Sequence, residues 1–419
     1  MSLIQPFRAY RPRPELAARV ASVPYDVVNT AEARQLADGN PYSFLHVCRP
    51  EIDLPEGIDE HEDRVYATGA ANLRKFIAEG ILAREAADSL YVYQQRMGSH
   101  VQAGLVALCS AREYEDNRIR KHEFTRRDKE DDRTRHVSEQ NANAEPVFLT
   151  YRAQAEIDAI VDGVRAGAPL YDIVTPDGIG HTLWRIADPV MIAGLVELFR
   201  AIEALYIADG HHRTASAVRY AQACRGRNPH STGNEPYESF MAVVFPHNQL
   251  KILDYNRVIK DLNGLTPQQL LAKLEEKFVV TSNVTSNVTS KGKRQPGQPA
   301  SFGMYLQGKW YTLQARAGSY PADHPIKRLD VSILQDNLLS PVLGIHDPRT
   351  DTRIDFVGGI RGMDELERRV KEGCAVAFAM YPTSLDQLIA VADAGQVMPP
   401  KSTWFEPKLR SGLLVRLYE

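Results

Sequence analysis

The chain has few of the sequence features that identify a class of protein on their own. Its 419 residues include only four cysteines, Cys48, Cys109, Cys224 and Cys374, which lie far apart. The paired spacing used by zinc ribbons and thioredoxin-like redox sites is therefore absent, and we expect reduced, packed thiols. The nucleotide motifs GxxxxGK[ST] and GxGxxG and the hydrolase motif GxSxG are also missing, so the usual phosphate-binding folds are not supported.

Long hydrophobic runs are lacking as well. No segment approaches the roughly 20 apolar residues of a membrane-crossing helix. The N-terminal MSLIQPFRAYRPRPELA has no apolar core of the kind that a signal peptide needs. We therefore expect a cytoplasmic protein with no membrane partner. The tripeptides that begin at Asn283 and Asn287 match glycosylation acceptors, but without a secretory signal they have no such meaning.

No charge of one sign dominates the chain. Its 50 lysines and arginines nearly balance 53 acidic residues, and the formal net charge is -3. No global field therefore attracts nucleic acid, and a helix-turn-helix pattern is also absent. We expect the partners to be a nucleotide and a small-molecule substrate rather than DNA or RNA.

The composition is that of an ordinary globular protein, and the length exceeds what one hydrophobic core usually supports. We expect three lobes, at residues 1–150, 151–290 and 291–419. Short β-rich runs alternate with helical patterns, which predicts an α/β or mixed α+β fold. The candidate strands are YSFLHV, SLYVYQQ, AGLVALCSA, ALYIAD, SFMAVVF, RIDFVGG and AVAFAMY. The candidate helices are ANLRKFIAEGIL, PVMIAGLVELFRAIE, TASAVRYAQAC and SLDQLIAVADAG.

The tract TSNVTSNVTSKGKRQPGQPAS, residues 281–301, offers almost no apolar side chains. This composition is typical of a surface loop. We expect the loop to lie between two lobes, with residues 285–299 exposed and mobile.

The strongest candidate for a functional site is ADGHHRT, residues 208–214. It follows an apolar run and precedes a helical pattern. The predicted order is a buried strand at 204–208, a tight turn at Gly210 and a helix from His211 to about Ala223. This order directs the first free backbone N–H groups of the helix beyond the end of the strand, where an anion such as phosphate binds.

Each residue of this turn has a use in a phosphate site. Gly210 permits a positive φ and a close approach of the ligand to the backbone. Arg213 can donate a forked pair of hydrogen bonds to phosphate, and Thr214 can add a hydroxyl. His211 and His212 can donate hydrogen bonds or transfer protons near neutral pH.

Two alternatives stay open for the same residues. Asp209 can simply cap the helix, with His211 and His212 as polar surface residues beside an ordinary turn. The second alternative is zinc or iron binding. Adjacent helical residues point about 100° apart, so His211 and His212 need ligands from elsewhere to share one ion.

Residues 118–136, RIRKHEFTRRDKEDDRTRH, form a dense run of both charges. One interpretation is a solvated helix braced by i,i+4 pairs such as Glu123 with Arg127 and Asp131 with Arg135. The other interpretation is a mobile lid over the phosphate site. The lid residues that we expect at the site are the phosphate-binding Arg126 and Arg127 and the acid–base candidates His122 and Glu123.

Three further segments are weaker candidates. Tyr25 and Asp26 follow a proline in VPYDVVN, where the carboxylate meets a metal or substrate or simply ends a strand in a turn. Gly358 and Gly359 stand between a strand and a helix, and a tight connection explains them better than a second ligand site does. The tail KSTWFEPKLRSG either folds back over the site or anchors the C-terminus by burying Trp404 and Phe405, and its other notable residues are Lys401, Glu406 and Lys408.

Several segments in a fixed order resemble one family. They are IQPFRAYRP, ASVPYDVV, YSFLHVCRPEI, ADGHHRTASA, LDVSILQDNLL and MPPKSTWFEPKLRSGL. Together they resemble the bacterial and archaeal family called domain of unknown function 1015, and the resemblance spans nearly the whole chain.

The DGHHR turn and its small-residue helix are also similar to the phosphate-binding turn of the ParB/sulfiredoxin superfamily, which includes partition CTPases, sulfiredoxin and free L-serine kinase. This second resemblance implies that Gly210, His211, His212 and Arg213 contact nucleotide phosphate. It also implies that Asp209 lies beside a hydroxyl substrate. The long regions that flank the turn depart from the compact ParB-like domains and leave the substrate site undefined.

These features favour a phosphotransferase that uses ATP or ADP with Mg²⁺ and acts on a small hydroxylated metabolite, with free L-serine as the named candidate. In this hypothesis Asp209, Asp26 and Glu123 share the base and metal roles. The alternatives are a nucleotide-switched binding protein of the ParB type and a phosphohydrolase or nuclease. Because a cation in the first turn of a helix opposes the helix dipole, we expect Arg213→Ala to weaken nucleotide binding far more than folding.

Overall fold

The structure is a computed structural model that describes residues 3–282 and 295–419. Within these residues the chain forms mixed α/β structure, as the sequence predicts. None of the helices in the two ranges combines the length and the apolar character that crossing a bilayer requires.

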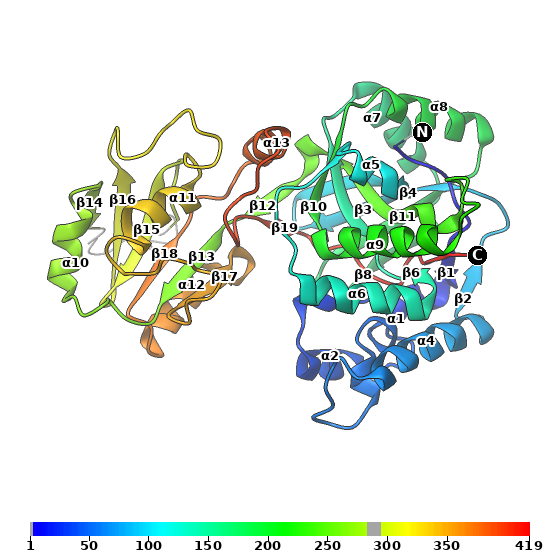
Figure 1. Ribbon diagram of the computed structural model, residues 1–419, viewed down its shortest axis with the longest axis horizontal. Helices are drawn as coiled ribbons and strands as arrows, with labels where there is room; N and C mark the ends of the chain where they lie inside the picture. The colour runs from blue at the N-terminus through cyan, green and yellow to red at the C-terminus, as the bar shows by residue number, and fades with distance from the viewer. Residues whose placement is uncertain (1–2, 283–294) are drawn as a thin grey trace. The chain divides into compact units, whose positions relative to one another are not determined.

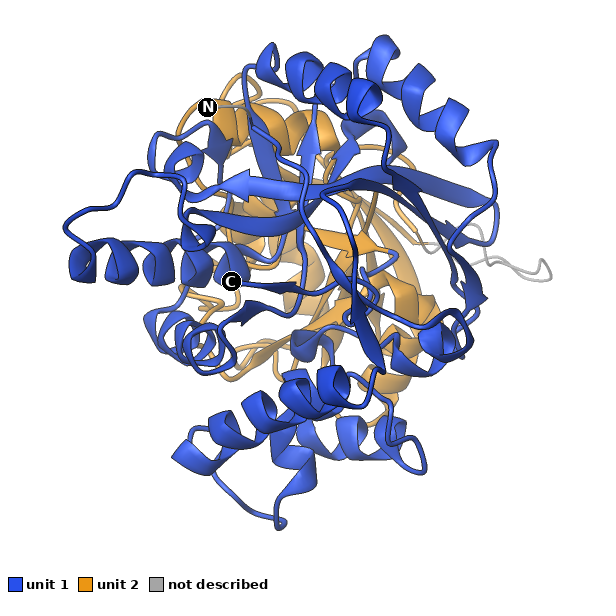
Figure 2. Cartoon of the chain, turned by 90° about the vertical axis from the view of Figure 1, so that its right-hand side faces the viewer, with its two compact units in different colours: residues 1–250, 407–419 blue, residues 251–406 orange. Residues whose placement is uncertain are grey.

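The chain divides into two compact units (Figure 2). Unit 1 comprises Met1–Leu250 and Pro407–Glu419, and unit 2 comprises Lys251–Glu406. Unit 1 is therefore discontinuous in sequence. This division differs from the expected boundaries at 150 and 290, because residue 150 lies inside a central strand of unit 1.

An eight-stranded sheet forms the centre of unit 1 (Figure 1). Its strand order is β5-β10-β7-β11-β4-β3-β9-β8. Neighbours are antiparallel except for the parallel pairs β5–β10 and β7–β11. The strands are β3 (Leu90–Met97), β4 (His100–Ser110), β5 (Ile119–Arg120), β7 (Val147–Tyr151), β8 (Tyr171–Val174), β9 (Gly180–Ile186), β10 (Leu205–Asp209) and β11 (Ser239–Pro246). The predicted strands in β3, β4, β10 and β11 are confirmed.

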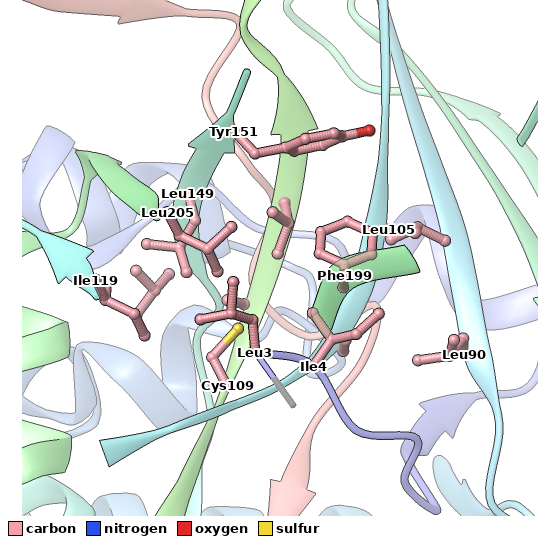
Figure 3. Packing of buried hydrophobic residues seen from close by; sticks show 14 of the residues in the cluster. Leu3, Ile4, Leu90, Leu105, Cys109, Ile119, Leu149, Tyr151, Phe199 and Leu205 are labelled. Atoms are coloured by element: carbon pink, nitrogen blue, oxygen red, sulfur yellow. The ribbon is translucent and has the colours of Figure 1, made fainter. Parts of the chain in front are cut away.

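One face of this sheet carries the main core of unit 1 (Figure 3). Alternate strand residues such as Leu105, Leu149 and Leu205 point to the same side of a pleated sheet and belong to one buried cluster. Three longer helices supply most of the helical residues of this core, which include Phe199 and Ala217. These helices are α7 (Ala155–Arg165), α8 (Pro189–Arg200) and α9 (His211–Arg227). The predicted helices in α8 and α9 are confirmed.

The N-terminal part of unit 1 forms a second, mainly helical core. Its helices are α1 (Ala17–Val20), α2 (Thr30–Ala37), α3 (Leu45–Cys48) and α4 (Asp63–Ala78), and α4 contains a predicted helix. The predicted strand YSFLHV is wrong, because its second half forms α3. Phe44, Leu45 and Val47 are all buried, so they pack into the core without the alternation of a half-buried strand.

Smaller elements complete unit 1. Two short antiparallel pairs join distant parts of the chain, β1 with β2 and β6 with β20. These elements, with the two remaining helices, are β1 (Tyr10–Pro12), β2 (Leu82–Arg84), β6 (Ala142–Asn143), β20 (Arg416–Leu417), α5 (Ala111–Glu115) and α6 (Arg127–Gln140). The C-terminal segment is thus built into unit 1.

Unit 2 is built on a six-stranded antiparallel sheet with the order β14-β16-β15-β18-β13-β17. Its strands are β13 (Tyr255–Ile259), β14 (Phe278–Ser282), β15 (Ser301–Leu306), β16 (Lys309–Ala315), β17 (Ile354–Gly358) and β18 (Val376–Ala379). Its helices are α10 (Pro267–Leu274), α11 (Asp330–Leu334), α12 (Gly362–Lys371) and α13 (Leu385–Asp393). The strand pair β12 (Lys251–Leu253) and β19 (Trp404–Glu406) joins the two ends of the unit. The predicted strands in β17 and β18 and the predicted helix in α13 are confirmed.

The polar tract at 281–301 lies within unit 2 rather than between lobes. It connects β14 to β15, and both strands pair with β16. Residues 295–299 are exposed or partly exposed, as predicted. The rest of the predicted mobile loop, with Asn283 and Asn287, lies outside the described residues.

Candidate functional site

The predicted strand, turn and helix at residues 204–223 are confirmed. Strand β10 ends at Asp209 and helix α9 follows it from His211, and both elements are labelled in Figure 1. Between them Gly210 adopts the left-handed conformation, with φ 88° and ψ 33°. The buried side chains of Leu205 and Ile207 hold β10 in the core. Only glycine takes this φ without strain, so Gly210 sets the angle between strand and helix.

The N-terminus of α9 has no side-chain cap among the described residues. The first helical hydrogen bond runs from the Thr214 backbone N to the Gly210 oxygen, at 2.9 Å. The Thr214 hydroxyl donates to the same oxygen, at 3.0 Å, and its side chain is fully buried. Thr214 therefore braces the turn, while the N–H groups of the first turn form the kind of helix end that attracts anions.

Asp209 does not cap the helix; it sits between two cations. Its Oδ1 accepts from the Gly210 N–H at 2.9 Å, and its Oδ2 accepts from the Lys408 ammonium at 2.9 Å. Arg213 Nη2 lies 4.0 Å from the same Oδ2. Burial alone would raise the pKa of this carboxyl, but Lys408 and Arg213 outweigh it and hold the pKa well below its usual range. Asp209 is therefore an anion at neutral pH.

The Arg213 side chain turns inward and is buried. Its Nη1 donates to the Pro146 oxygen at 2.6 Å, and its Nη2 lies 3.8 Å from Asp26 Oδ2. Its Nε lies 3.1 Å from where a Cβ on Gly210 would stand. Arg213 is thus an ionic link beneath the turn, a role that its position in the first helical turn did not predict.

The predicted N-terminal candidates reach the same place. Asp26 lies in a 3₁₀ turn, Tyr25–Val27, and its partly exposed carboxylate shares Arg213 with Asp209. Tyr25 is buried, and its ring lies 4.0 Å from the Arg133 guanidinium carbon. The turn that holds Asp26 is thereby fixed against α6.

His122 and Glu123 also lie at the turn. The rings of His122 and His211 meet edge to face, with centroids 4.5 Å apart. Burial lowers the pKa of His122 to about 4 and lowers the pKa of His211 well below its usual value. Both imidazoles are therefore neutral at pH 7. Their depressed pKa values make them poor general bases and good neutral donors or ligands.

The charged run 118–136 divides into β5, an irregular stretch and α6. The Arg126 backbone N–H donates to His212 Nε2 at 3.1 Å, which places the start of α6 beside the first turn of α9. The side chains of Arg126 and Arg127 are exposed there. Burial lowers the pKa of His212, which suits its role as an acceptor.

The expected i,i+4 brace between Asp131 and Arg135 is wrong, because each side chain finds a partner on another helix. Asp131 pairs with Arg219 of α9, and Arg135 pairs with Asp63 of α4. α6 is therefore held between its neighbours rather than solvated alone. This packing fixes the segment that carries the predicted lid residues.

Gly358 and Gly359 lie in unit 2, at the end of β17. A Cβ on Gly358 would stand 2.9 Å from the Trp404 ring, and a Cβ on Gly359 would lie even closer to the Asp254 side chain. This close packing supports the tight connection and explains both glycines without a ligand.

One residue of this site, Glu145, was not found from the sequence. Lys408 stands in the tail that was expected either to fold back over the site or to anchor the C-terminus, and its ammonium pairs with Asp209. Glu145 is partly buried, and its carboxylate accepts hydrogen bonds from the Tyr25 N–H and the Ser411 hydroxyl. Burial raises the pKa of Glu145. No local pattern predicts the contacts of Glu145 or the pair of Lys408 with Asp209, because the partners are distant in sequence.

The fold and the site define a mixed α/β protein in which a buried strand, a left-handed glycine and an uncapped helix N-terminus meet at one turn, beside the carboxylate of Asp209. The chain belongs to the family described as Protein of unknown function (DUF1015), whose model matches residues 4–332. No curated protein matches the chain.

Several solved structures are similar to parts of the chain. Free serine kinase in complex with AMP is 13% identical, with a TM-score of 0.36, over 74% of this chain and 92% of that one. SbnI with a C-terminal truncation, from Staphylococcus aureus, is 11% identical, with a TM-score of 0.37, over 74% and 87%. A conserved hypothetical protein from Pyrococcus furiosus is 12% identical, with a TM-score of 0.34, over 74% and 95%. At these TM-scores the likeness assigns no role to any residue of this chain.

Proposed function

We propose that the protein is a nucleotide-dependent phosphotransferase that acts on a small hydroxylated metabolite, with free L-serine as the candidate that the resemblance of the turn implies. One observation carries the proposal. The uncapped N-terminus of α9 and the carboxylates of Asp209 and Asp26 meet at a single turn, where Arg213 links both carboxylates. A donor for phosphate and an acceptor for a hydroxyl proton are thus side by side.

The phosphate-binding part of this site is the helix end. The N–H groups of the first turn of α9 point to one region, and the helix dipole adds a partial positive charge there. The exposed guanidinium groups of Arg126 and Arg127 stand at the neighbouring helix start, which the contact with His212 holds in place. These groups would neutralise the donor phosphates as charge moves onto the leaving nucleotide.

The hydroxyl-binding part is Asp209. In the reaction the substrate oxygen bonds to the terminal phosphorus of the nucleotide, the bond from that phosphorus to the bridging oxygen breaks, and the shortened nucleotide leaves. The hydroxyl proton passes to Asp209 and then to water. Because Lys408 and Arg213 keep the pKa of Asp209 low, this carboxylate mainly orients the hydroxyl and takes the proton late. Phosphoryl transfer tolerates such a weak base, since positioning and charge neutralisation dominate it.

Carboxylate oxygens are the ligands that Mg²⁺ prefers, and Asp26 and Asp209 supply them at this turn. Asp26 is better placed to bind Mg²⁺, because its carboxylate is partly exposed and lies 3.8 Å from the Arg213 guanidinium. The Asp209 carboxylate is already held by the Lys408 ammonium, at 2.9 Å. When bound with the nucleotide, Mg²⁺ would supply charge neutralisation between phosphate oxygens.

The experiment is a product search with the full-length protein. It is incubated with ATP or ADP, Mg²⁺ and a mixture of hydroxylated metabolites that includes L-serine, and the products are identified by mass spectrometry. We expect one phosphorylated metabolite, formed in step with ADP or AMP. Release of inorganic phosphate without such a product would show a phosphohydrolase instead. Nucleotide binding without turnover would favour a nucleotide-switched binding protein.

A further inference from the structure

Three side chains at the start of α9 come together in the arrangement of metal ligands. They are His122 and Glu123, which follow β5, and His211, the first residue of α9. One ligand atom from each, an imidazole nitrogen or a carboxylate oxygen, lies within 4.8 Å of the other two. The two histidines are buried and the glutamate is half-buried, so the group stands at the edge of the core.

His211 adds a second observation. Its Nε2 is buried and has no hydrogen-bond partner among the described residues, and the whole residue is only 6% exposed. Buried polar atoms nearly always have a partner, because an unpaired one loses its hydrogen bonds to water without compensation. A ligand that this nitrogen can bind would remove that cost.

The spacing suits a small ion after a modest contraction. Ligand atoms about 2.1 Å from a tetrahedral ion lie about 3.4 Å from one another. The Glu123 side chain is flexible and half-buried, so it can close most of the remaining gap. His212 is not part of this group. The ligands that His211 needs from outside its own helix are His122 and Glu123, which lie in the loop before α6.

We propose that His122, Glu123 and His211 bind one divalent transition-metal ion, of which Zn²⁺ is the first candidate. Two imidazoles and one carboxylate suit Zn²⁺, Mn²⁺, Fe²⁺ or Co²⁺ better than Mg²⁺, which takes oxygen ligands. Metal ions bind the neutral form of imidazole. The negative charge of Glu123 offsets the unfavourable position of a cation at the positive end of α9.

This site goes beyond the proposed function, because the ion would bind in the absence of nucleotide or substrate. It leaves positions open for water or for a phosphate oxygen, as sites with three protein ligands do. The metal site can therefore be tested without any assay of phosphoryl transfer.

The test is a titration of the metal-free, full-length protein with Co²⁺, followed by its visible absorption, and with Zn²⁺ and Mg²⁺, followed by calorimetry. The variant is Glu123→Gln, which keeps size and shape but removes the ligand charge. The matched control is His230→Gln, which removes an exposed histidine remote in sequence from the cluster. Thermal melts of all three metal-free proteins check that each is folded.

We expect one Co²⁺ or Zn²⁺ per chain in the wild type and in His230→Gln, with little response to Mg²⁺. Glu123→Gln should lose about tenfold or more in affinity for Zn²⁺ while its metal-free melting temperature stays near that of the wild type. Equal affinity of Glu123→Gln and the wild type would overturn the proposal, and so would a folded wild type that binds neither Co²⁺ nor Zn²⁺. In either case the rings of His122 and His211 pack against each other without binding a metal ion.

Discussion

Arg213 stabilises the turn between β10 and α9 through a buried side chain that contacts two acidic residues. Its guanidinium is buried, donates to a backbone oxygen and lies within 4.0 Å of two carboxylates. The sequence places it in the first turn of a helix, where a cation is unfavourable in isolation. The two acids that reverse this preference come from β10 and from a turn near the N-terminus, so only the folded chain brings them together.

We therefore expect Arg213→Ala to cost about 3 kcal/mol of unfolding free energy, because it leaves the acids beneath the turn without their shared cation. Arg219→Ala, in the same helix, is the matched control. Arg219 forms ion pairs that are partly exposed and worth below about 1 kcal/mol. Denaturant unfolding without ligand measures both values. If the two variants are equally stable and only Arg213→Ala loses nucleotide binding, the role expected from the sequence is the right one.

His181 is a single buried residue whose protonation should make the stability of the fold depend on pH. Its ring is buried, Nδ1 lies 2.7 Å from the Tyr93 hydroxyl, and Nε2 lies 3.1 Å from both Arg410 Nε and Thr175 Oγ1. Since the arginine can only donate, Nε2 is an acceptor and the ring is neutral. Burial, helped by Arg410 and opposed by Asp177, lowers the pKa of His181 to about 3.

A histidine whose pKa is lower in the folded state stabilises the fold fully above its unfolded pKa, near 6.5, and this stability is lost as the pH falls toward 3. Below about pH 6 we expect the wild type to lose about 1.4 kcal/mol per pH unit more than His181→Gln does. Denaturant unfolding at pH 7, 6 and 5 measures the two slopes. Parallel curves would show that His181 is charged in the native protein.

At the scale of elements, the turn between β10 and α9 sets the geometry of the site. Gly210→Ala forces a side chain into a left-handed conformation and places its Cβ 3.1 Å from Arg213 Nε. We expect it to cost about 1–2 kcal/mol of unfolding free energy. Gly226→Ala is the control in the same helix, where no atom lies within 4 Å of the new Cβ, and it should stabilise α9 by up to about 1 kcal/mol. Thermal and denaturant unfolding compare the two, and a Gly210→Ala protein as stable as Gly226→Ala would contradict the role of the turn.

The elements themselves followed well from sequence wherever the apolar period was clear. The change of period at Gly210 located both the end of β10 and the start of α9. The strand predicted for YSFLHV is wrong because a short apolar run fits a strand and a buried helix equally well. In the N-terminal core its second half packs as helix α3. At the site, the turn residues and Asp26 were found, whereas the pair of Lys408 with Asp209 was not. These partners are 199 residues apart, and no local pattern connects them.

At the scale of the whole molecule, unit 2 is inserted into unit 1. Its first and last residues, Lys251 and Glu406, are paired across β12 and β19, so the chain leaves unit 1 and returns at adjacent points. The expected boundaries at 150 and 290 missed this arrangement. Unit 1 is discontinuous, and its second segment begins at Pro407. No linker-like sequence marks that boundary.

We expect unit 1 to fold when residues 251–406 are replaced by a linker of about three glycines, because paired residues of antiparallel strands lie only about 5 Å apart. The shortened chain should give a cooperative thermal transition and dispersed amide NMR signals. Residues 1–250 without the C-terminal segment are the control, and they should be less stable because they lack β20 and the ion pair of Lys408. An unfolded shortened chain would show that unit 1 depends on unit 2.

The most direct test of the proposed function is phosphoryl transfer by Asp209→Asn. This change removes the charge that orients the hydroxyl and keeps the size of the side chain. The control is Asp188→Asn, which retains the oxygen that caps α8 through the Val190 N–H. We predict that Asp209→Asn binds nucleotide at least as tightly as the wild type and transfers phosphate about 10²–10⁴-fold more slowly, while Asp188→Asn is unchanged. Transfer by Asp209→Asn at the wild-type rate, or no transfer by the wild type to any hydroxylated metabolite, would contradict the assignment.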